Sequence, residues 1–187
     1  MAVIIRRLEE TDGTGNFDCG DQPLNNYLHK YAWVNQEKSS LGVTYVAVEE
    51  AAPRTVLGYF TVAMASVPRE AFPAKYARGL PNYGVPLILL ARLAVDLRFA
   101  GRGIGHALIS EAFRISLRVS VEVGCRCVIT DSYRDRMSWY ARYGFIPIEG
   151  AAAEGPQRMF LDIRTIRQAR RGVGSPACES AYRPTCL

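Results

Sequence analysis

The chain has 187 residues, of which 49% are hydrophobic and 22% are charged, and its formal net charge at pH 7 is +5. A chain of this length and composition forms one globular domain with a sizeable core. It has no run of eighteen apolar residues and no basic region followed by a long apolar core at its N-terminus, so we expect a cytoplasmic protein that neither spans a membrane nor carries a signal peptide.

The positive charge is concentrated at the C-terminal end. From Arg164 onward five arginines are accompanied by one acid, Glu179, whereas the rest of the chain is nearly neutral. The net charge is therefore weak evidence for nucleic-acid binding. Only three of the 23 basic residues are lysines; arginine suits phosphate recognition, although a GC-rich genome gives the same bias. We expect a domain over residues 1–168 and a basic, disordered tail over residues 169–187.

The five cysteines form no metal-binding motif. Their number is odd and no two are spaced as C-x-x-C. The pair Cys125 and Cys127 points to one face of a strand and is too stiff for half of a zinc site. We expect buried or free thiols in a reducing compartment, and no metal.

The first half of the chain predicts a strand, a helix and a hairpin. Residues 3–8 are an apolar strand, and Asp21 or Gln22 caps a helix with Pro23 in its first turn. Residues 42–48 and 56–64 form an antiparallel hairpin around a turn at 52–54. Residues 66–86 hold four prolines and predict an irregular loop with a helical turn near 69–75.

The second half alternates strands and helices. A fully buried strand is expected over residues 87–95, followed by a helix from Ile104 that ends at Gly124. Residues 125–130 then form a strand parallel to the first, because a helix connects the two. Asp135 is expected to cap a helix that reaches Gly144, and strands follow over 145–148 and 158–163.

Three glycines, at positions 101, 103 and 105, join the strand over 87–95 to the helix that follows. A glycine-rich loop at a helix start exposes backbone N–H groups at the positive end of the helix dipole. It predicts an anion site, most naturally for phosphate. A simple strand-to-helix turn would need only one or two glycines, each of which costs conformational entropy.

Two common nucleotide loops do not fit this segment. A P-loop requires Gly-Lys-Ser/Thr at its end, but Gly105 is followed by His106 and Ala107. A dinucleotide fingerprint requires the spacing G-x-G-x-x-G in an opening βαβ unit, whereas this loop has G-x-G-x-G and follows antiparallel strands.

The remaining interpretation is a coenzyme A pyrophosphate loop. Arg92-Leu-Ala-Val-Asp96, Ala100-Gly-Arg-Gly-Ile-Gly105 and Trp139-Tyr-Ala-Arg-Tyr-Gly-Phe145 resemble motifs of the GNAT N-acetyltransferase superfamily. The resemblance implies an α/β (α+β) fold: a mixed, mostly antiparallel sheet of six to seven strands, a central parallel pair splayed at the cofactor site, and helices on both faces. It implies acetyl-CoA as the donor, bound by Leu93, Ala94, Val95, Ala100, Gly101, Arg102, Gly103, Ile104, Gly105 and His106.

The loop departs from the family pattern at one position. The pattern Q/R-x-x-G-x-G/A begins here with Ala100, which lacks the side-chain contact of Gln or Arg. Arg98, in an overlapping frame, or Arg102, within the loop, can supply the charge. Ala100 does not impair binding through backbone N–H groups.

The resemblance also selects the catalytic residues. A backbone N–H near Val95 would meet the thioester carbonyl, and Tyr140 would stabilise the departing thiolate. Tyr143 faces a similar direction, but with Phe145 it fits a packing role better. No general base is evident, which suits an amine of low pKa, since an α-amine has a pKa near 8 and a lysine one near 10.4.

A closer resemblance points to one group within the superfamily. Four segments are similar to the GNAT toxins of toxin–antitoxin pairs, which acetylate aminoacyl-tRNA: Phe17-Asp-Cys-Gly-Asp-Gln-Pro-Leu-Asn-Asn-Tyr-Leu28, Tyr45-Val-Ala-Val, Gly58-Tyr-Phe and Leu90-Ala-Arg-Leu-Ala-Val-Asp96. This implies a ribbon-helix-helix antitoxin as partner, is compatible with a homodimer, and assigns Arg92, with Arg78 and Arg98, to the tRNA groove. An ion pair of Arg92 with Asp96 or another acid is the structural alternative. Two alternative functions are left open. The chain would be a GNAT enzyme that acetylates a small-molecule or protein amine, or a non-catalytic module that binds acyl-CoA or an antitoxin.

Overall fold

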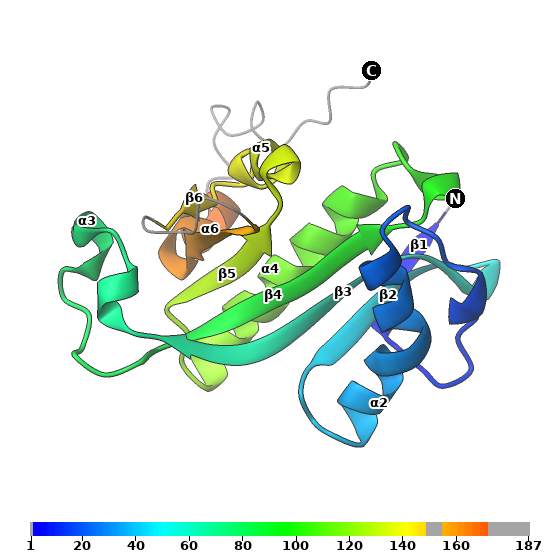
Figure 1. Ribbon diagram of the computed structural model, residues 1–187, viewed down its shortest axis with the longest axis horizontal. Coiled ribbons are helices and arrows are strands. Elements are labelled where there is room, and N and C mark those ends of the chain that lie inside the picture. The colour runs from blue at the N-terminus through cyan, green and yellow to red at the C-terminus, as the bar shows by residue number, and fades with distance from the viewer. Residues whose placement is uncertain (1, 149–154, 172–187) are drawn as a thin grey trace. The chain divides into compact units, whose positions relative to one another are not determined.

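The computed structural model describes residues 2–148 and 155–171 and contains a seven-stranded sheet of order β1-β2-β3-β4-β5-β7-β6 (Figure 1). The strands are β1 (Val3–Arg7), β2 (Val43–Glu49), β3 (Ala52–Val67), β4 (Val85–Val95), β5 (Cys127–Ser132), β6 (Ile146–Pro147) and β7 (Gln157–Asp162). The pairs β1–β2, β2–β3, β5–β7 and β6–β7 are antiparallel, whereas β4 and β5 are parallel. The expected mixed, mostly antiparallel sheet with one parallel pair is confirmed.

The α-helices are α1 (Gln22–Asn26), α2 (Ala32–Glu37), α3 (Ala74–Ala77), α4 (Ile104–Glu122), α5 (Met137–Ala141) and α6 (Ile163–Arg171). None of the described helices is long and apolar enough to cross a membrane. Contacts divide the chain into two compact units, Met1–Ala63 with Leu90–Arg114, and Met64–Leu89 with Ile115–Leu187. The elements β3, β4 and α4 each run from one unit into the other.

In the first unit, β3 is covered on its two faces by different helices. Tyr59 is fully buried and its hydroxyl donates to the Leu24 carbonyl of α1 at 2.8 Å. The next residue toward the N-terminus, Gly58, faces α4, because strand neighbours point to opposite sides. A Cβ built on Gly58 would lie 2.9 Å from both the Ala94 carbonyl oxygen and the Leu108 side chain. Gly58 therefore allows α4 to approach the sheet closely.

A π-helical segment, Tyr27–Tyr31, joins α1 to α2. The sequence did not predict it, because its apolar residues recur at ordinary helical spacing. Tyr27 and Leu28 are buried there, in a core cluster with Phe17 and Tyr59. Asp21 is the N-cap of α1, and its side chain accepts from the Leu24 N–H at 3.0 Å. Of the two caps that the sequence predicted, Asp21 and Gln22, the structure has Asp21.

The second unit has its own core between β4, β5, β7 and the segment that contains α3. Phe160 of β7 contacts Phe72 and Tyr76 edge-on, at centroid distances of 5.6 and 4.9 Å. Within this unit the parallel pairing runs from Leu87–Cys127 to Leu89–Ile129, and both strands continue beyond it. Cys125 and Cys127 are buried free thiols, as expected, while Cys178 and Cys186 lie outside the described residues.

Three local predictions are wrong. The β2–β3 turn is at residues 50–51 and not 52–54, because a bulge in the pairing accommodates Pro53 at the start of β3. Asp135 caps no helix: it lies in the 3₁₀ turn Arg134–Arg136 and pairs with Arg136 at the surface. Residues 163–171 form α6, which the sequence analysis missed, and the helix continues past residue 168. Residues 172–187 of the predicted tail lie outside the described residues.

We predict that Gly58→Ala lowers the free energy of unfolding by about 2 kcal/mol, since the added methyl group overpacks the contact between β3 and α4. Urea unfolding would measure the change. Gly15→Ala is the matched control, because a Cβ at Gly15 meets nothing within 4 Å. Equal effects of the two substitutions would contradict the close approach at Gly58.

Candidate functional site

The glycine loop adopts a conformation that needs glycine at two positions. Gly101 and Gly103 have φ angles of +75° and +79°, and a Cβ on either would meet nothing within 4 Å. The helix α4 starts directly afterwards, where the Ala107 N–H donates to the Gly103 carbonyl at 3.1 Å. The first N–H groups of an α-helix have no carbonyl partner within it. The loop therefore offers open backbone at the positive end of a helix, which fits a pyrophosphate.

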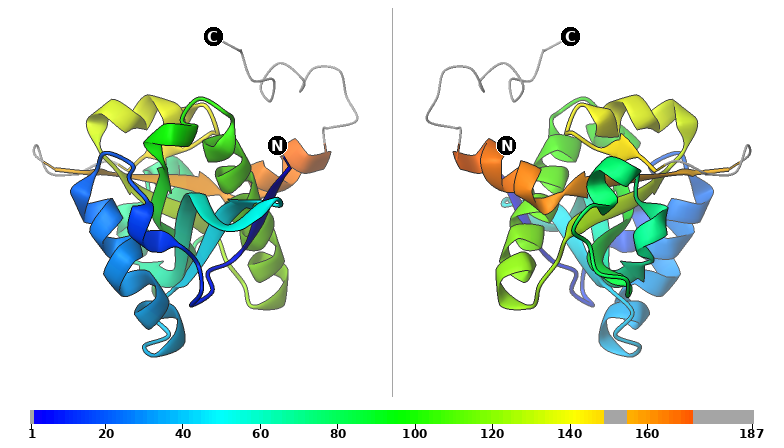
Figure 2. Two further views of the ribbon diagram at one scale, coloured as in Figure 1. Left: turned by 90° about the vertical axis from the view of Figure 1, so that its right-hand side faces the viewer. Right: turned by 90° about the vertical axis from the view of Figure 1, so that its left-hand side faces the viewer.

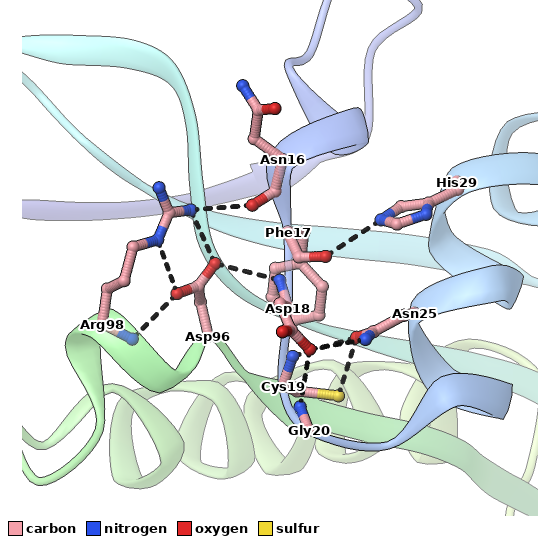
Figure 3. A network of polar contacts seen from close by, with 9 residues as sticks. All are labelled: Asn16, Phe17, Asp18, Cys19, Gly20, Asn25, His29, Asp96 and Arg98. Carbon is pink, nitrogen blue, oxygen red and sulfur yellow. Dashed lines mark hydrogen bonds and ion pairs between the residues drawn. The ribbon is translucent and has the colours of Figure 1, made fainter.

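A buried carboxylate holds the chain between β4 and this loop (Figure 3). Asp96 is fully buried, and its side chain accepts from the Arg98 main-chain N–H at 2.9 Å, as the cap of a 3₁₀ turn over Leu97–Phe99. The Arg98 guanidinium binds the same carboxylate through Nε at 2.9 Å and Nη2 at 2.7 Å. A fourth donor, the Asp18 N–H, lies 3.2 Å from Asp96 Oδ2.

The same network fixes the main chain on either side of Asp96. The Asp96 N–H donates to the Leu57 carbonyl of β3 at 3.0 Å, and the Leu97 N–H donates to the Asp18 carbonyl at 2.8 Å. Hydrogen bonds from the Arg98 side chain lower the pKa of Asp96, outweighing burial, which raises it. Asp96 is therefore ionised at neutral pH and stabilises the fold as a carboxylate.

The network extends into the segment that carries the toxin-like motif. Asp18 Oδ1 accepts from the Gly20 N–H at 2.9 Å and from Asn25 Nδ2 at 2.7 Å, and these bonds lower the pKa of Asp18. Asn25 is buried and in turn accepts from the Cys19 N–H at 2.9 Å. Sequence reasoning included Asp18 and Asn25 only as members of the toxin-like motif and gave neither an individual role.

The predicted cofactor residues are placed as follows. Ala94 is buried at the end of β4, while Leu93 and Val95 are partly exposed beside it. Ala100, Gly101, Arg102 and Gly103 are exposed, and Gly105 and His106 are partly exposed in the first turn of α4. Ile104 is buried, so its side chain belongs to the core, and only its backbone is available to a ligand.

The arginines near the loop differ in their partners. Arg98 is bound to Asp96 and also donates to the Asn16 carbonyl at 3.0 Å. Arg102 lies 5.5 Å from the Phe99 ring centroid and pairs with no acid in the described part of the chain. Arg98 and Arg102 were the two candidates to supply the positive charge that the family pattern places at position 100. The geometry favours Arg102, because Arg98 is already bound to Asp96.

The arginines assigned to the tRNA groove occupy different surroundings. The Arg92 guanidinium lies 3.9 Å from the centroid of the Tyr27 ring, a cation–π contact. The alternative of an ion pair of Arg92 with Asp96 or another acid is wrong: Arg92 forms no such pair among the described residues, and the Asp96 carboxylate is held by Arg98. Arg78 belongs to the second unit, where it is exposed at the end of α3.

Tyr140 lies in α5 of the second unit, within an aromatic cluster. Its ring contacts Trp139 at 4.9 Å and Phe145 at 5.5 Å, both edge-on. Burial raises the pKa of Tyr140, and a hydrogen bond with Thr130 and the charge of Arg136 oppose this. The Tyr143 ring also contacts Trp139, at a centroid distance of 4.9 Å. Tyr140 is therefore a protonated phenol at neutral pH, able to donate a hydrogen bond.

No group of three or more His, Cys, Asp and Glu side chains is arranged to hold a metal ion among residues 2–148 and 155–171. The two histidines are both outside such a cluster. His29 Nε2 lies 3.0 Å from the Phe17 carbonyl oxygen, and His106 is in α4.

Among known proteins, this chain is similar in sequence to bacterial toxins. No protein-family model matches the chain. A tRNA-acetylating toxin of Mycobacterium tuberculosis is 29% identical over 141 residues, which are 75% of this chain and 82% of the relative. The "Probable toxin TacT" of Sinorhizobium fredii is 28% identical over 160 residues, 81% of this chain and 85% of the relative.

Solved structures of AtaT are similar in fold. AtaT complexed with acetyl-methionyl-tRNAfMet has a TM-score of 0.79 and 26% identity, and the match covers 89% of this chain and 98% of AtaT. A crystal structure of AtaTR bound with acetyl-CoA has a TM-score of 0.74 at the same identity, over 89% of this chain and 96% of that one.

The chain has the GNAT fold, which it shares with AtaT, and a glycine loop at the start of α4. Within that fold it is similar to toxin-type acetyltransferases, as the resemblance of its motifs predicted.

We predict that Asp96→Asn lowers the free energy of unfolding at pH 7 by about 2 kcal/mol, since it leaves donors of Arg98 without their charged acceptor. The pKa of Asp96 is lowered in the folded state, so this stabilisation is complete above a pH of about 3.9 and is lost as the pH falls through the lower, folded pKa. Urea unfolding from pH 7 to pH 3 should therefore show the difference between the two proteins shrinking in acid.

Asp131→Asn is the matched control, because it removes the same charge from an ion pair with Arg158 in which both side chains are exposed. Such pairs contribute at most about 1 kcal/mol. A pH-independent difference for Asp96→Asn would contradict the carboxylate's role.

We predict that Arg102→Ala raises the Kd for acetyl-CoA about fivefold, the loss of roughly 1 kcal/mol expected for an exposed phosphate contact. Titration calorimetry at low and high KCl would measure it, and the effect should decrease with salt. Arg98→Ala should instead reduce stability. If Arg98→Ala alone weakened binding while stability stayed unchanged, the phosphate contact would belong to Arg98.

Proposed function

We propose that this chain transfers the acetyl group of acetyl-CoA to the α-amine of an aminoacyl-tRNA and thereby blocks translation in the cytoplasm. The observation that carries the proposal is the match to the structure of AtaT complexed with acetyl-methionyl-tRNAfMet, which covers 98% of AtaT. This chain combines that likeness with an open glycine loop that fits a pyrophosphate. A ribbon-helix-helix antitoxin would neutralise the activity.

The residues of the loop fit the pyrophosphate of the donor. Gly101 and Gly103 leave space where side chains would project, and the start of α4 supplies N–H groups. Arg102 adds an unpaired positive charge. When bound, acetyl-CoA supplies an activated thioester carbonyl, and the end of β4 near Val95 offers a backbone N–H to the carbonyl oxygen.

The role we propose for Tyr140 is hydrogen-bond donation to the departing thiolate. An ordinary phenol has a pKa of about 10 and a thiol one of about 8.5, so proton transfer from phenol to thiolate is already uphill. Burial raises the pKa of Tyr140 further. The phenol therefore stabilises the thiolate as a hydrogen-bond donor, and the proton that the thiolate gains is balanced overall by the one that the amine loses when the amide bond forms and the C–S bond breaks.

The acceptor must reach the site with a neutral amine. The α-amine of an aminoacyl ester has a lower pKa than a lysine side chain, so it needs little help in losing a proton. Arg92, stacked on Tyr27, is suited to a phosphate of the acceptor end, because stacking leaves the edge of a guanidinium available for hydrogen bonds. Arg78 is a second basic contact, in the second unit.

We predict that Tyr140→Phe lowers kcat for aminoacyl-tRNA acetylation by roughly a hundred- to a thousandfold, the usual contribution of a positioned proton donor. KM for acetyl-CoA should change little, since the ring and its contacts remain. Tyr143→Phe is the matched control and should retain activity. Mass spectrometry of aminoacyl-tRNA after incubation with acetyl-CoA would measure both.

The same variants test the toxin function in cells. Induction of the wild-type chain should arrest growth, and Tyr140→Phe should relieve the arrest. Harmless expression together with acetylation of small or protein amines would favour another GNAT activity. Binding of acetyl-CoA without transfer to any amine would indicate a binding module.

A further inference from the structure

The helix α6 carries an arginine at every third position on its outer face. Arg164, Arg167 and Arg170, named here the arginine stripe, are exposed, whereas Ile163 and Ile166 are buried against the second unit. The helix follows β7 directly and is drawn in orange in Figure 2.

The charge of the stripe exceeds that of its neighbouring acids. Asp162, at the start of α6, accepts from the Arg164 N–H at 2.8 Å and pairs with two guanidinium groups, that of Arg126 at 2.8 Å and that of Arg164 at 3.2 Å. Burial raises the pKa of Asp162, but the hydrogen bonds of Arg164 and the charge of Arg126 outweigh it, so the pKa is lowered. One carboxylate therefore faces two cations.

The other two members have no acidic partner in the described part of the chain. Arg167 Nη2 contacts the neutral Ser120 hydroxyl of α4 at 3.3 Å. The helix dipole explains a cation in the last turn, such as Arg170, but it opposes one in the first turn, where Arg164 lies. Dipole compensation therefore does not account for the stripe as a whole.

The spacing of the stripe suits a row of phosphates. Residues three apart on a helix are neighbours with Cβ atoms about 5–6 Å apart, so the stripe presents adjacent guanidinium forks, which bind phosphate oxygens in pairs. The exposed residues between them, Thr165 and Gln168, are polar. Protein interfaces are centred on apolar or aromatic residues, and this face has none, whereas nucleic-acid interfaces are polar and positive.

We propose that Arg167 and Arg170 of the arginine stripe bind the phosphodiester backbone of the tRNA substrate, away from its aminoacylated end, while Arg164 stays paired with Asp162. This inference rests on the proposed function for the identity of the RNA. In this inference α6 contributes to tRNA affinity and not to the chemical step. Substitutions in α6 should therefore change KM for the tRNA and leave kcat unchanged.

The test compares Arg167→Gln/Arg170→Gln with Arg7→Gln/Arg54→Gln, a double variant that removes two charges from exposed arginines of the first unit. Glutamine keeps a high helix propensity. Each full-length protein is assayed for acetylation of charged bulk tRNA and of an aminoacylated trinucleotide that ends in CCA. Binding of deacylated bulk tRNA is measured between 50 and 300 mM KCl.

We expect the stripe variant to raise KM and Kd for tRNA roughly tenfold and to lower the salt slope of binding by about 1.5, the value for two lost phosphate contacts. Activity on the trinucleotide should match that of the wild type. The Arg7/Arg54 variant should change none of these quantities by more than about twofold.

Three results would overturn the inference. They are an unchanged Kd for tRNA, an equal loss of activity on the trinucleotide, or a loss of affinity for the antitoxin with tRNA binding intact. Failure of the proposed function looks different, because the wild-type chain would then acetylate neither acceptor, and the binding measurement would still decide whether the stripe contacts RNA.

Discussion

The site depends on one ion pair, in which a buried carboxylate is held by an arginine at the surface. Asp96 is fully buried where β4 ends, and it receives donors from Arg98 and from Asp18. This arrangement turns the chain out of the strand and into the glycine loop. Glycines lose more conformational entropy on folding than other residues, so a loop with two positive φ angles needs fixed ends. The Asp96 network fixes one end and α4 fixes the other.

The sequence predicted the loop because its chemistry is local. The φ angles of Gly101 and Gly103 require glycine, and a helix start follows immediately, so the residues involved are neighbours in the chain. The parallel pair β4–β5 was predictable for a similar reason, since a connecting helix constrains its direction. The departure at Ala100 remains a substitution that this backbone tolerates: Ala100 is exposed and ends the 3₁₀ turn.

The partners of the arginines were not predictable in the same way. Arg92 and Arg98 are both near Asp96 in sequence, and alternation along a strand puts Arg92 on the same face as Asp96. The strand ends at Val95, however, and Asp96 caps the turn that follows, so its carboxylate folds over residue 98. The geometry of the cap therefore determines that Asp96 pairs with Arg98, and the alternation of a strand does not predict this pairing. The helix α6 was missed because two isoleucines among four arginines resemble a polar tail.

Some arginines of this chain stabilise the fold and others are available to a ligand. The two groups differ in whether a buried carboxylate holds the guanidinium. Asp12, Asp96 and Asp162 each hold a guanidinium at 2.6 to 2.8 Å, and all three are buried. Removing a partner from such a pair leaves a buried charge uncompensated, so these arginines are committed to the fold.

Arg102, Arg167 and Arg170 project outward without acidic partners in the described chain. An arginine held by a buried carboxylate cannot release it to a phosphate without loss of stability, whereas an unpaired one exchanges only water. The candidates for phosphate binding are therefore arginines that no acid of the described chain holds: Arg102 in the glycine loop, Arg167 and Arg170 on α6, and Arg92, which stacks on Tyr27.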